Sequence, residues 1–506
     1  MIKATVIRRL LLLGASLLPA PALAETLREA LARAYATNPT LTGQRANLRA
    51  TDENVPIARA NGLPSLNTSA QFTENLVVAS NAFLAPARQL SGNTQLAVPL
   101  YQGGAVRNAV NAAETRVEAG RATLRGTEAN LFTSVVGAYM DVIRDEAIVR
   151  LNQQNVRVLD VNLGASRDRY QVGDLTRTDV AQSEARLALA RAQLQSAEAR
   201  LIGSRENYVN LVGVAPVALE EPPTLPNLPP SPDAAVTIAL DNNPALLAAI
   251  KQRDATRFDV GVARAQRLPQ VSAVAGGTYF NFLGSLPAAA AVGRGQSGQG
   301  ATAGLQLNLP IFQGGRPGAQ VRQAQALRSQ AIENVTATER GVIAQARSAY
   351  ASWRSSNEVI ASSEAAVSAN RLSLEGVRAE NSVGTRTILD ILNAEQELLN
   401  SQVTLVSARR DAYVAGFSLL AAMGEAEAQD LGLDGGPLYD PVANYNRVRR
   451  SINDFASDGE PTAMATRTNE TPAQTAIATR PLDPALDGAV DRSPALTTGA
   501  ASPNRQ

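Results

Sequence analysis

One unit of sequence occurs twice in this chain, and this repetition constrains the fold more than any other feature. Three short motifs appear in both copies: Asn-Pro, Leu-Pro, and Pro-Leu-Tyr-Gln-Gly-Gly or its variant Pro-Ile-Phe-Gln-Gly-Gly. They begin at Asn38, Leu63 and Pro99 in the first copy and at Asn243, Leu268 and Pro310 in the second. The offset is 205 residues for the first two motifs and 211 for the third, so the second copy carries six extra residues between about 270 and 310. We therefore expect two copies of one architecture.

The copies divide the chain into segments. The first copy covers residues 25–213 and the second covers residues 234–424. Between them, residues 214–233 contain seven Pro and show no hydrophobic periodicity, which is typical of a linker. Residues 456–506 are rich in Pro, Thr, Ala, Ser and Asp, and this composition predicts a disordered tail.

Each copy contains, in order, the patterns of a helix, two strands, a long helix and a shorter helix. The first helices are expected at about 27–61 and 234–267, the strands at about 63–101 and 268–312, and the long helices at about 104–170 and 315–382. A helix of about 67 residues is roughly 100 Å long, which exceeds what a compact domain needs. The sequence thus predicts a mainly α protein of elongated rods with a small β part.

The strand segments alternate in polarity. In the last of them, Leu305, Leu307, Leu309 and Ile311 alternate with Gln306, Asn308 and Pro310. About ten residues with one apolar and one polar face are typical of a membrane-spanning barrel strand. A sheet that covers a soluble core shows the same alternation. Four strands are too few to close a membrane barrel, whereas three chains would supply twelve.

The amino-terminal segment indicates export from the cytoplasm. Residues 1–24 combine basic residues, the apolar run Leu10–Leu18 and an Ala-x-Ala ending, as a secretory signal peptide does. Removing its three basic residues from the 47 in the chain leaves 44, against 46 acidic residues. This near balance argues against a nucleic acid partner. No later apolar run is long enough to predict a transmembrane helix.

Composition also argues against an enzyme. The chain contains no His and no Cys, so the most frequent general base, the thiol nucleophile and the common transition-metal ligands are absent. No cluster of carboxylates or lysines replaces them. We therefore expect no catalytic residues, no metal site and no cofactor.

The two long helices end in similar turns. Gly173 and Gly384 suit the residue after a helix end, and Thr176 and Thr387 can cap the next helix. Three residues after each Thr stands an acid, Asp179 in the first copy and Asp390 in the second. These acids complete a capping box, and a purely capping role is the simpler interpretation.

The duplicated Leu-Pro and Gln-Gly-Gly motifs, together with the run Val-Gly-Thr-Arg-Thr-Ile-Leu-Asp-Ile-Leu-Asn-Ala-Glu at 383–395, resemble the TolC family of outer-membrane efflux and type I secretion channels. The match covers about residues 25–424. The resemblance implies a homotrimer with a twelve-stranded outer-membrane barrel that continues into a long periplasmic α-helical barrel. It also implies that residues 425–455 wrap the middle of the helical barrel.

The resemblance assigns roles at the turns. Asp390 matches a ring of carboxylates at the periplasmic aperture, and Asn393 stands where some members have a second Asp. Arg386, Thr178 and Asp179 match residues that latch the aperture shut. Implied partners are outer-membrane lipid, a periplasmic adaptor, or membrane-fusion, protein, and an inner-membrane pump or ABC transporter. The alternative function is a periplasmic coiled-coil scaffold or adaptor without a pore.

Overall fold

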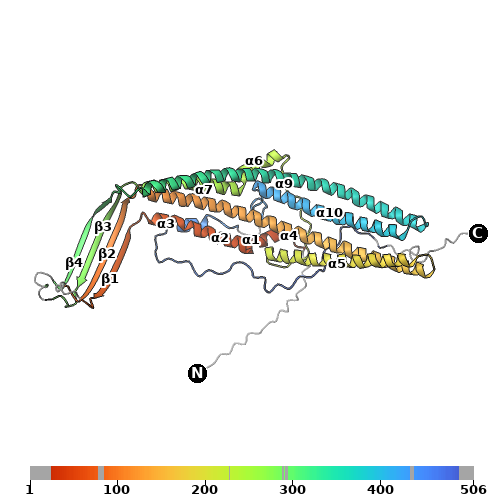
Figure 1. The fold of residues 1–506 in the computed structure, drawn as a ribbon, viewed down its shortest axis with the longest axis horizontal. Coiled ribbons are helices and arrows are strands. Elements are labelled where there is room, and N and C mark those ends of the chain that lie inside the picture. Colours follow the sequence, from red (N-terminus) through yellow and green to blue (C-terminus); the bar gives the residue numbers. More distant parts are fainter. Residues whose placement is uncertain are drawn as a thin grey trace, which may run out of the picture.

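The protein is a rod of long helices with a small sheet at one end (Figure 1). The computed structural model describes residues 24–77, 85–226, 228–287, 290, 295–433, 438–488 and 490. The expected signal peptide, apart from Ala24, lies outside the described residues.

Two antiparallel helical hairpins form most of the rod. The first consists of α4 (Ala105–Gln171) and α5 (Arg177–Val212), and the second consists of α9 (Arg316–Ser382) and α10 (Ile388–Met423). The long helices α4 and α9 have 67 residues each, as the sequence predicted. Their turns lie at the end of the rod farthest from the sheet (Figure 1).

The first helix of each copy is interrupted, which corrects the expectation of single helices at 27–61 and 234–267. The observed helices are α1 (Leu27–Thr37), α2 (Pro39–Asp52) and α3 (Asn54–Ala60) in the first copy, and α6 (Pro232–Asn242) and α7 (Pro244–Ala265) in the second. Proline restricts the residue before it to extended backbone, and this breaks the helix at both Asn-Pro motifs. Pro232, assigned to the linker, is the first residue of α6.

The two Asn-Pro motifs also join helices end to end. Asn38 Oδ1 accepts a hydrogen bond from the N–H of Thr40 in α2, while its Nδ2 donates to the carbonyl oxygen of Leu211 near the end of α5, at 2.9 Å. Asn243 caps α7 in the same way and donates to the carbonyl oxygen of Ala422 in α10, also at 2.9 Å. One side chain thus satisfies two helix ends, which fixes the short helices in line with α5 and α10.

The core lies at mid-length, where the helices of both copies meet the segments that connect them. Phe132, Tyr139, Tyr208 and Phe417 are fully buried there. The hydroxyl of Tyr139 lies 2.6 Å from the carbonyl oxygen of Glu220 in the linker. The linker is therefore packed against the core.

Four antiparallel strands form one sheet in the order β1-β2-β3-β4. They are β1 (Ser65–Glu74), β2 (Arg88–Tyr101), β3 (Gln270–Asn281) and β4 (Ser297–Asn308). Because β4 ends at Asn308, the predicted strand residues Leu309 and Ile311 lie beyond it. Within the described chain, β1 and β4 are edges with no partner on their outer sides.

The register separates the two faces of the sheet by polarity. Directly paired residues share a face. Leu96 pairs with Leu66 and Ala275, and Leu307 pairs with Val271. The opposite face carries mainly polar residues, among them Asn67, Gln71, Gln95, Gln306 and Asn308. The predicted alternation in one strand therefore extends across all four.

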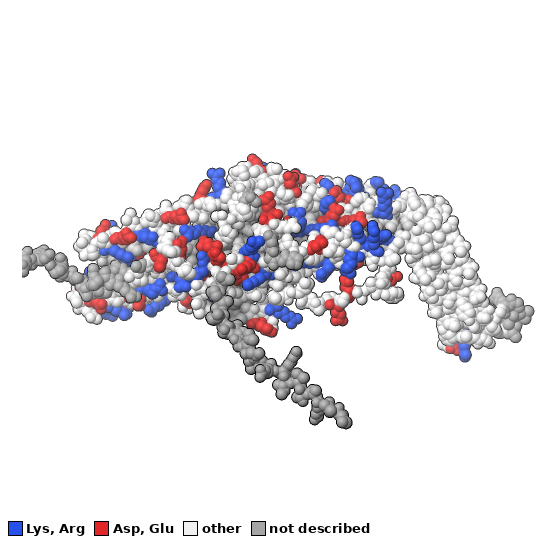
Figure 2. All heavy atoms as spheres, turned by 180° about the vertical axis from the view of Figure 1, so that it is seen from behind, with Lys and Arg blue, Asp and Glu red and all other residues white. Residues whose placement is uncertain are grey.

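Charged residues are nearly absent from this sheet. Figure 2 shows a white sheet beside helices that are covered with red and blue side chains. Within the four strands, the only charged residues are Glu74 and Arg88, which pair at 3.2 Å at the end far from the helices. Apart from this pair, the strands carry no charge. Such strands are typical of a sheet with one face toward lipid and the other toward a lumen, and not of a sheet with bulk water on both sides.

Among the described residues, no helix has both the length and the apolar character needed to cross a bilayer.

The carboxyl-terminal residues pack along the rod. Residues 425–433 and 438–448, including α11 (Ala443–Val448), contact the first copy: Arg125 Nε donates to Glu427 at 2.6 Å, and Asn444 donates to Asp52 at 2.8 Å. The prediction of a disordered tail from residue 456 is wrong for residues 474–488. These residues lie along the helices in many specific contacts, described below. Residue 489 and residues 491–506 of the predicted tail lie outside the described residues.

Candidate functional site

Both hairpins end in the same turn. Gly173 and Gly384 have φ of 85° and 81°, a left-handed conformation that glycine adopts at little cost. In each turn two hydrogen bonds close the helix end: the N–H of Gly173 donates to Tyr170 and that of Asp174 donates to Arg169. The second turn repeats both bonds at the equivalent positions. These are Schellman motifs, so the tip geometry follows directly from the local sequence.

The next helix in each hairpin begins with a capping box. Thr176 Oγ1 accepts from the N–H of Asp179 at 3.3 Å, and an Asp179 carboxylate oxygen accepts from the N–H of Thr176 at 2.9 Å. Thr387 and Asp390 make the same bonds at 3.3 and 3.0 Å. The predicted capping role of both acids is thus present in the single chain.

The same bonds set the charge of the two acids. The Thr176 hydroxyl and N–H hold the pKa of Asp179 below its ordinary value. At Asp390, the N–H and the hydroxyl of Thr387 lower the pKa of the carboxyl in the same way, with a smaller contribution from Arg386. Both carboxylates are therefore ionised at neutral pH, and both are partly exposed at the end of the rod.

The latch residues do not meet within one chain. Arg386 Nε donates to Glu380 Oε2 at 2.7 Å across its own turn, and Asn381 Nδ2 donates to the carbonyl oxygen of Arg386. Among the described residues, no hydrogen bond joins Arg386 to Thr178 or Asp179, which lie on the other tip. Glu380 was not predicted as a partner of Arg386, although its position one turn before Gly384 could have suggested it.

Asn393 instead joins the two hairpins. Arg186 Nη2 in α5 donates to Asn393 Oδ1 in α10 at 2.7 Å. Beneath this bond, an apolar cluster contains residues of both hairpins, including Leu159, Leu187 and Leu392. Arg186 was not predictable as a site residue, because its partner lies more than 200 residues away and no local pattern connects them.

Each hairpin also carries an Arg–Glu pair behind its tip. Arg167 pairs with Glu184 at 2.7 Å, and Arg378 pairs with Glu395. The first pair is about half exposed, whereas Glu395 is 8% exposed. Burial raises the pKa of the Glu395 carboxyl, and Arg378 opposes this shift. The spacing of 17 residues occurs in both copies and is the signal from which these pairs could have been found.

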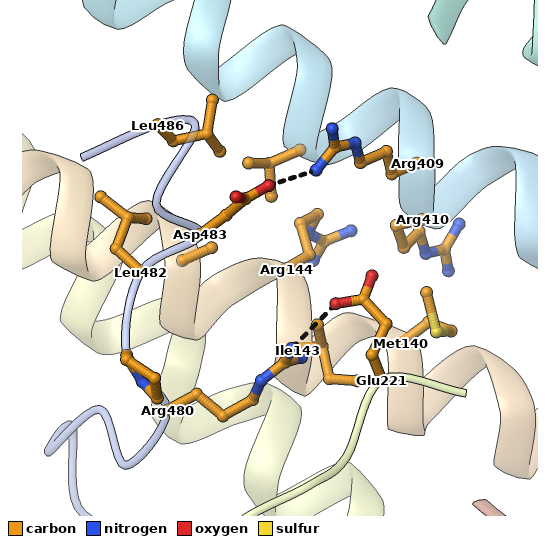
Figure 3. Close-up of a pocket in the computed structure, with 13 residues that line it drawn as sticks. Met140, Ile143, Arg144, Glu221, Arg409, Arg410, Arg480, Leu482, Asp483 and Leu486 are labelled. Atoms are coloured by element: carbon orange, nitrogen blue, oxygen red, sulfur yellow. Dashed lines mark hydrogen bonds and ion pairs between the residues drawn. The ribbon is translucent and has the colours of Figure 1, made fainter. Parts of the chain in front are cut away.

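A cavity of about 70 Å³ lies between α4, α10 and the carboxyl-terminal residues (Figure 3). Four guanidinium groups line it, and each is paired with carboxylates of this chain. Arg144 pairs with Asp141 and Asp145, Arg409 with Asp483 and Glu364, Arg410 with Asp141 and Asp411, and Arg480 with Glu221. The cavity is thus neutralised by its own residues and is not an anion-binding site.

Comparison with known proteins identifies the architecture. The model of the family described as "Outer membrane efflux protein" matches residues 30–214 and 235–425, one segment in each copy. Outer membrane efflux protein BepC of Brucella suis biovar 1 is 34% identical over 449 residues, which cover 88% of this chain and 95% of that protein. Outer membrane protein TolC of Escherichia coli K12 is 27% identical over 430 residues, or 83% and 86% of the two chains.

A solved structure gives the same fold. The crystal structure of the outer membrane protein VceC from Vibrio cholerae has a TM-score of 0.67 and 24% identity, and the match covers 79% of this chain and 96% of VceC. The resemblance seen in the sequence is therefore confirmed, and the chain belongs to the outer membrane efflux protein family.

Proposed function

We propose that three copies of this chain form one channel in the outer membrane, continued by a helical tunnel through the periplasm. The channel is a passive conduit for export from the cell. The observation that carries the proposal is the sheet: it has one apolar face, one polar face and almost no charge.

The sheet is incomplete in one chain. Its outer strands β1 and β4 have unpaired backbone N–H and C=O groups along both edges of the sheet. Within a membrane there is no water to bind these groups, so each edge needs another strand as its partner. Pairing β4 of one chain with β1 of the next in a ring of three gives twelve strands. The face with Leu96 and Leu307 then meets lipid, and the face with Gln95 and Asn308 lines a wet lumen.

The tips form the periplasmic aperture in this assembly. Threefold symmetry brings three ionised Asp390 carboxylates around a narrow mouth, where they favour cations over anions. Arg386 latches the closed mouth by reaching Thr178 and Asp179 on a neighbouring hairpin, and for this it exchanges its bond to Glu380. Asn393 adds no charge to the ring.

A periplasmic adaptor and an inner-membrane pump or ABC transporter open the tips and supply the cargo. The cargo is either small toxic compounds or a secreted protein, and the pump selects it. A deletion strain tested in parallel for drug sensitivity and for loss of a secreted protein distinguishes these two uses. Recovery of the protein only from the soluble periplasm would contradict the conduit and would indicate a periplasmic scaffold without a pore.

Planar-bilayer recording tests the conduit and its aperture together. Wild-type trimers should conduct and prefer cations, and multivalent metal cations added from the periplasmic side should block them. Asp390→Asn should weaken both the selectivity and the block, whereas Asn393→Ala, three residues away, should leave both near wild type. A wild-type protein without channels would refute the conduit. Equal behaviour of wild type and Asp390→Asn would leave Asp390 as a helix cap alone.

A further inference from the structure

The strap, which we define as residues 474–488, is an extended segment that contacts both hairpins. It contains no helix or strand. It begins beside α5, where the N–H of Gln474 donates to Glu206, and ends beside α4, where Gln154 donates to the carbonyl oxygen of Gly488. Between these points it contacts α9 and α10.

A buried ion pair of the first hairpin anchors the start of the strap. The side chains of Glu146 in α4 and Arg205 in α5 are 4% and 6% exposed. Arg205 donates to the carbonyl oxygens of Thr475 at 2.6 Å and Ile477 at 2.8 Å. Glu146 accepts from the Thr479 hydroxyl at 2.9 Å and from the N–H of Arg480 at 3.0 Å. The strap therefore satisfies hydrogen-bonding groups that burial would otherwise leave unpaired.

The second hairpin holds the other half of the strap. Arg409 Nη1 donates to Asp483 Oδ2 at 2.7 Å (Figure 3), and this bond lowers the pKa of the Asp483 carboxyl. Gln402 donates to the carbonyl oxygen of Leu486 at 3.0 Å. The side chain of Leu486 is 2% exposed and packs among apolar residues of α4, α9 and α10.

Only the first copy carries the anchor. At the offset of 211 residues, Glu146 corresponds to Asn357, Arg150 to Ala361 and Arg205 to Gly416. Arg150 donates to the carbonyl oxygens of Ala478 and Arg480, both at 2.8 Å. The second copy thus lacks all three side chains that bind the strap in the first, although its backbone repeats the same hairpin.

We propose that the strap is a clamp that fixes the two hairpins of each chain to one another at mid-length, so that opening of the tips is confined to the part beyond the strap. This inference rests on the proposed function. Between Gln154 and the end of α4 lie 17 residues, or about 26 Å of helix, and this part of α4 carries no strap contact among the described residues. The corresponding part of α10, before Gln402, is about 21 Å long.

Two truncations separate the strap from the residues that follow it. A chain ending at Ala473 loses the strap, and a chain ending at Val490 keeps it and serves as the matched control. Hydrogen exchange is measured on detergent-solubilised trimers, with single-channel conductance as a second readout. The chain ending at Ala473 should exchange about tenfold or more faster in α4 between Glu146 and Gln154 and should open more often, because local opening of this part of α4 no longer breaks strap contacts. The chain ending at Val490 should match wild type.

A point variant tests the clamp should the truncated chain fail to fold. Leu486→Asp breaks only the distal half, so exchange should rise in α10 between Gln402 and Arg409 while the Glu146–Arg205 anchor stays protected. Wild-type exchange in both the truncation and Leu486→Asp would overturn the clamp. Exchange is measured without a membrane, so this outcome is distinguishable from failure of the conduit, which would appear as absence of wild-type channels.

Discussion

The two long helices of this protein have the same length but very different surroundings. Both α4 and α9 contain 67 residues and begin after a left-handed Gly, yet 27 residues of α4 are buried and only six of α9. The difference arises because α4 is surrounded by α1, α2, α3, α5, α7, α10 and the carboxyl-terminal segment. In contrast, the helices that contact α9 are α6, α7 and α10, and it touches the linker and the strap through Tyr350 and Arg371 (Figure 1). One flank of α9 is thus open in the single chain.

Residues at equivalent positions of α4 and α9 differ in the same way. Arg116 of α4 pairs with Asp259, and the guanidinium of Arg121 lies 5.1 Å from the ring of Tyr445. At the same positions α9 has Leu327 and Ile332, which are 54% and 43% exposed. In α4, residues of the same chain contact these charged side chains. In α9, the apolar side chains at the same positions are exposed, and burial of them against another chain agrees with the proposed trimer.

The largest effect should come from charging the open flank of α9. We expect Leu327→Asp combined with Ile332→Asp to abolish the trimer, because assembly would bury unpaired carboxylates at a cost of several kcal/mol per chain. Light scattering after size-exclusion chromatography measures the assembly. Arg116→Leu with Arg121→Leu, the equivalent change in α4, should leave it trimeric. A trimeric Asp variant would show that this flank of α9 faces solvent.

The strands should show the opposite result, namely equal behaviour of the two copies. Leu96 and Leu307 are equivalent and lie on the same apolar face. Leu96→Arg and Leu307→Arg should each cost roughly 2 to 4 kcal/mol per chain if they face the middle of the membrane, and should reduce trimer recovery from outer membranes. Gln95→Arg and Asn308→Arg, on the lumen face, should be tolerated. Equal losses for both faces would contradict the face assignment.

Local sequence predicted the parts of this fold that local forces determine. Gly173 and Gly384 ended the long helices, Thr176 and Thr387 began the next ones, and the alternation around Leu307 predicted the two faces of the sheet. Distant contacts were not predictable in this way. The two Asn-Pro motifs were recognised in the sequence only as repeat markers, and the helix breaks at their prolines were missed although they are local. The second role of the two Asn side chains depends on carbonyl groups of α5 and α10.

The strap was missed for the same reason. Its composition of Pro, Thr and Ala has no periodicity, and composition alone predicts disorder. Its order comes instead from Glu146 and Arg205, which lie about 270 to 330 residues earlier in the chain. At the tips, the sequence named the capping residues but could not predict that Glu395 is buried while Glu184 is half exposed.

The Arg–Glu pairs behind the tips should also differ between the two copies, by a smaller loss of stability than in the preceding predictions. Arg378→Ala leaves the buried Glu395 without its partner and should cost roughly 2 to 3 kcal/mol of local stability. Arg167→Ala breaks a half-exposed pair and should cost at most about 1 kcal/mol. Hydrogen exchange near each pair measures both. Equal costs would mean that the burial of Glu395 has no energetic consequence.

The stability of the second hairpin near its tip should depend on pH through Glu395. Burial raises the pKa of Glu395 above its ordinary value of 4.5, so the folded state holds the proton more tightly than the unfolded state. Its contribution to stability is therefore present below pH 4.5 and is lost as pH rises through the folded pKa. Removing Arg378 should raise this pKa further and move the loss to higher pH.

The smallest effect should be the same in both copies. Thr176→Ala and Thr387→Ala each remove one helix cap and should each cost about 1 kcal/mol of local stability. The amide protons of Asp179 and Asp390, which the two hydroxyls accept, report the loss by faster exchange. A much larger cost at Thr387 alone would indicate that the second tip depends on contacts beyond its own turn.

The single strap has a consequence for stoichiometry. Three chains with two similar hairpins each would form a ring of six nearly equivalent hairpins. Because only the first copy has the residues that anchor a strap, the ring carries three straps, and its sixfold pseudosymmetry falls to threefold. A protein that bound the helices of the hairpins alone would have six sites around the tunnel. A protein that bound the strap would have three, so the number of bound copies would show which surface it binds.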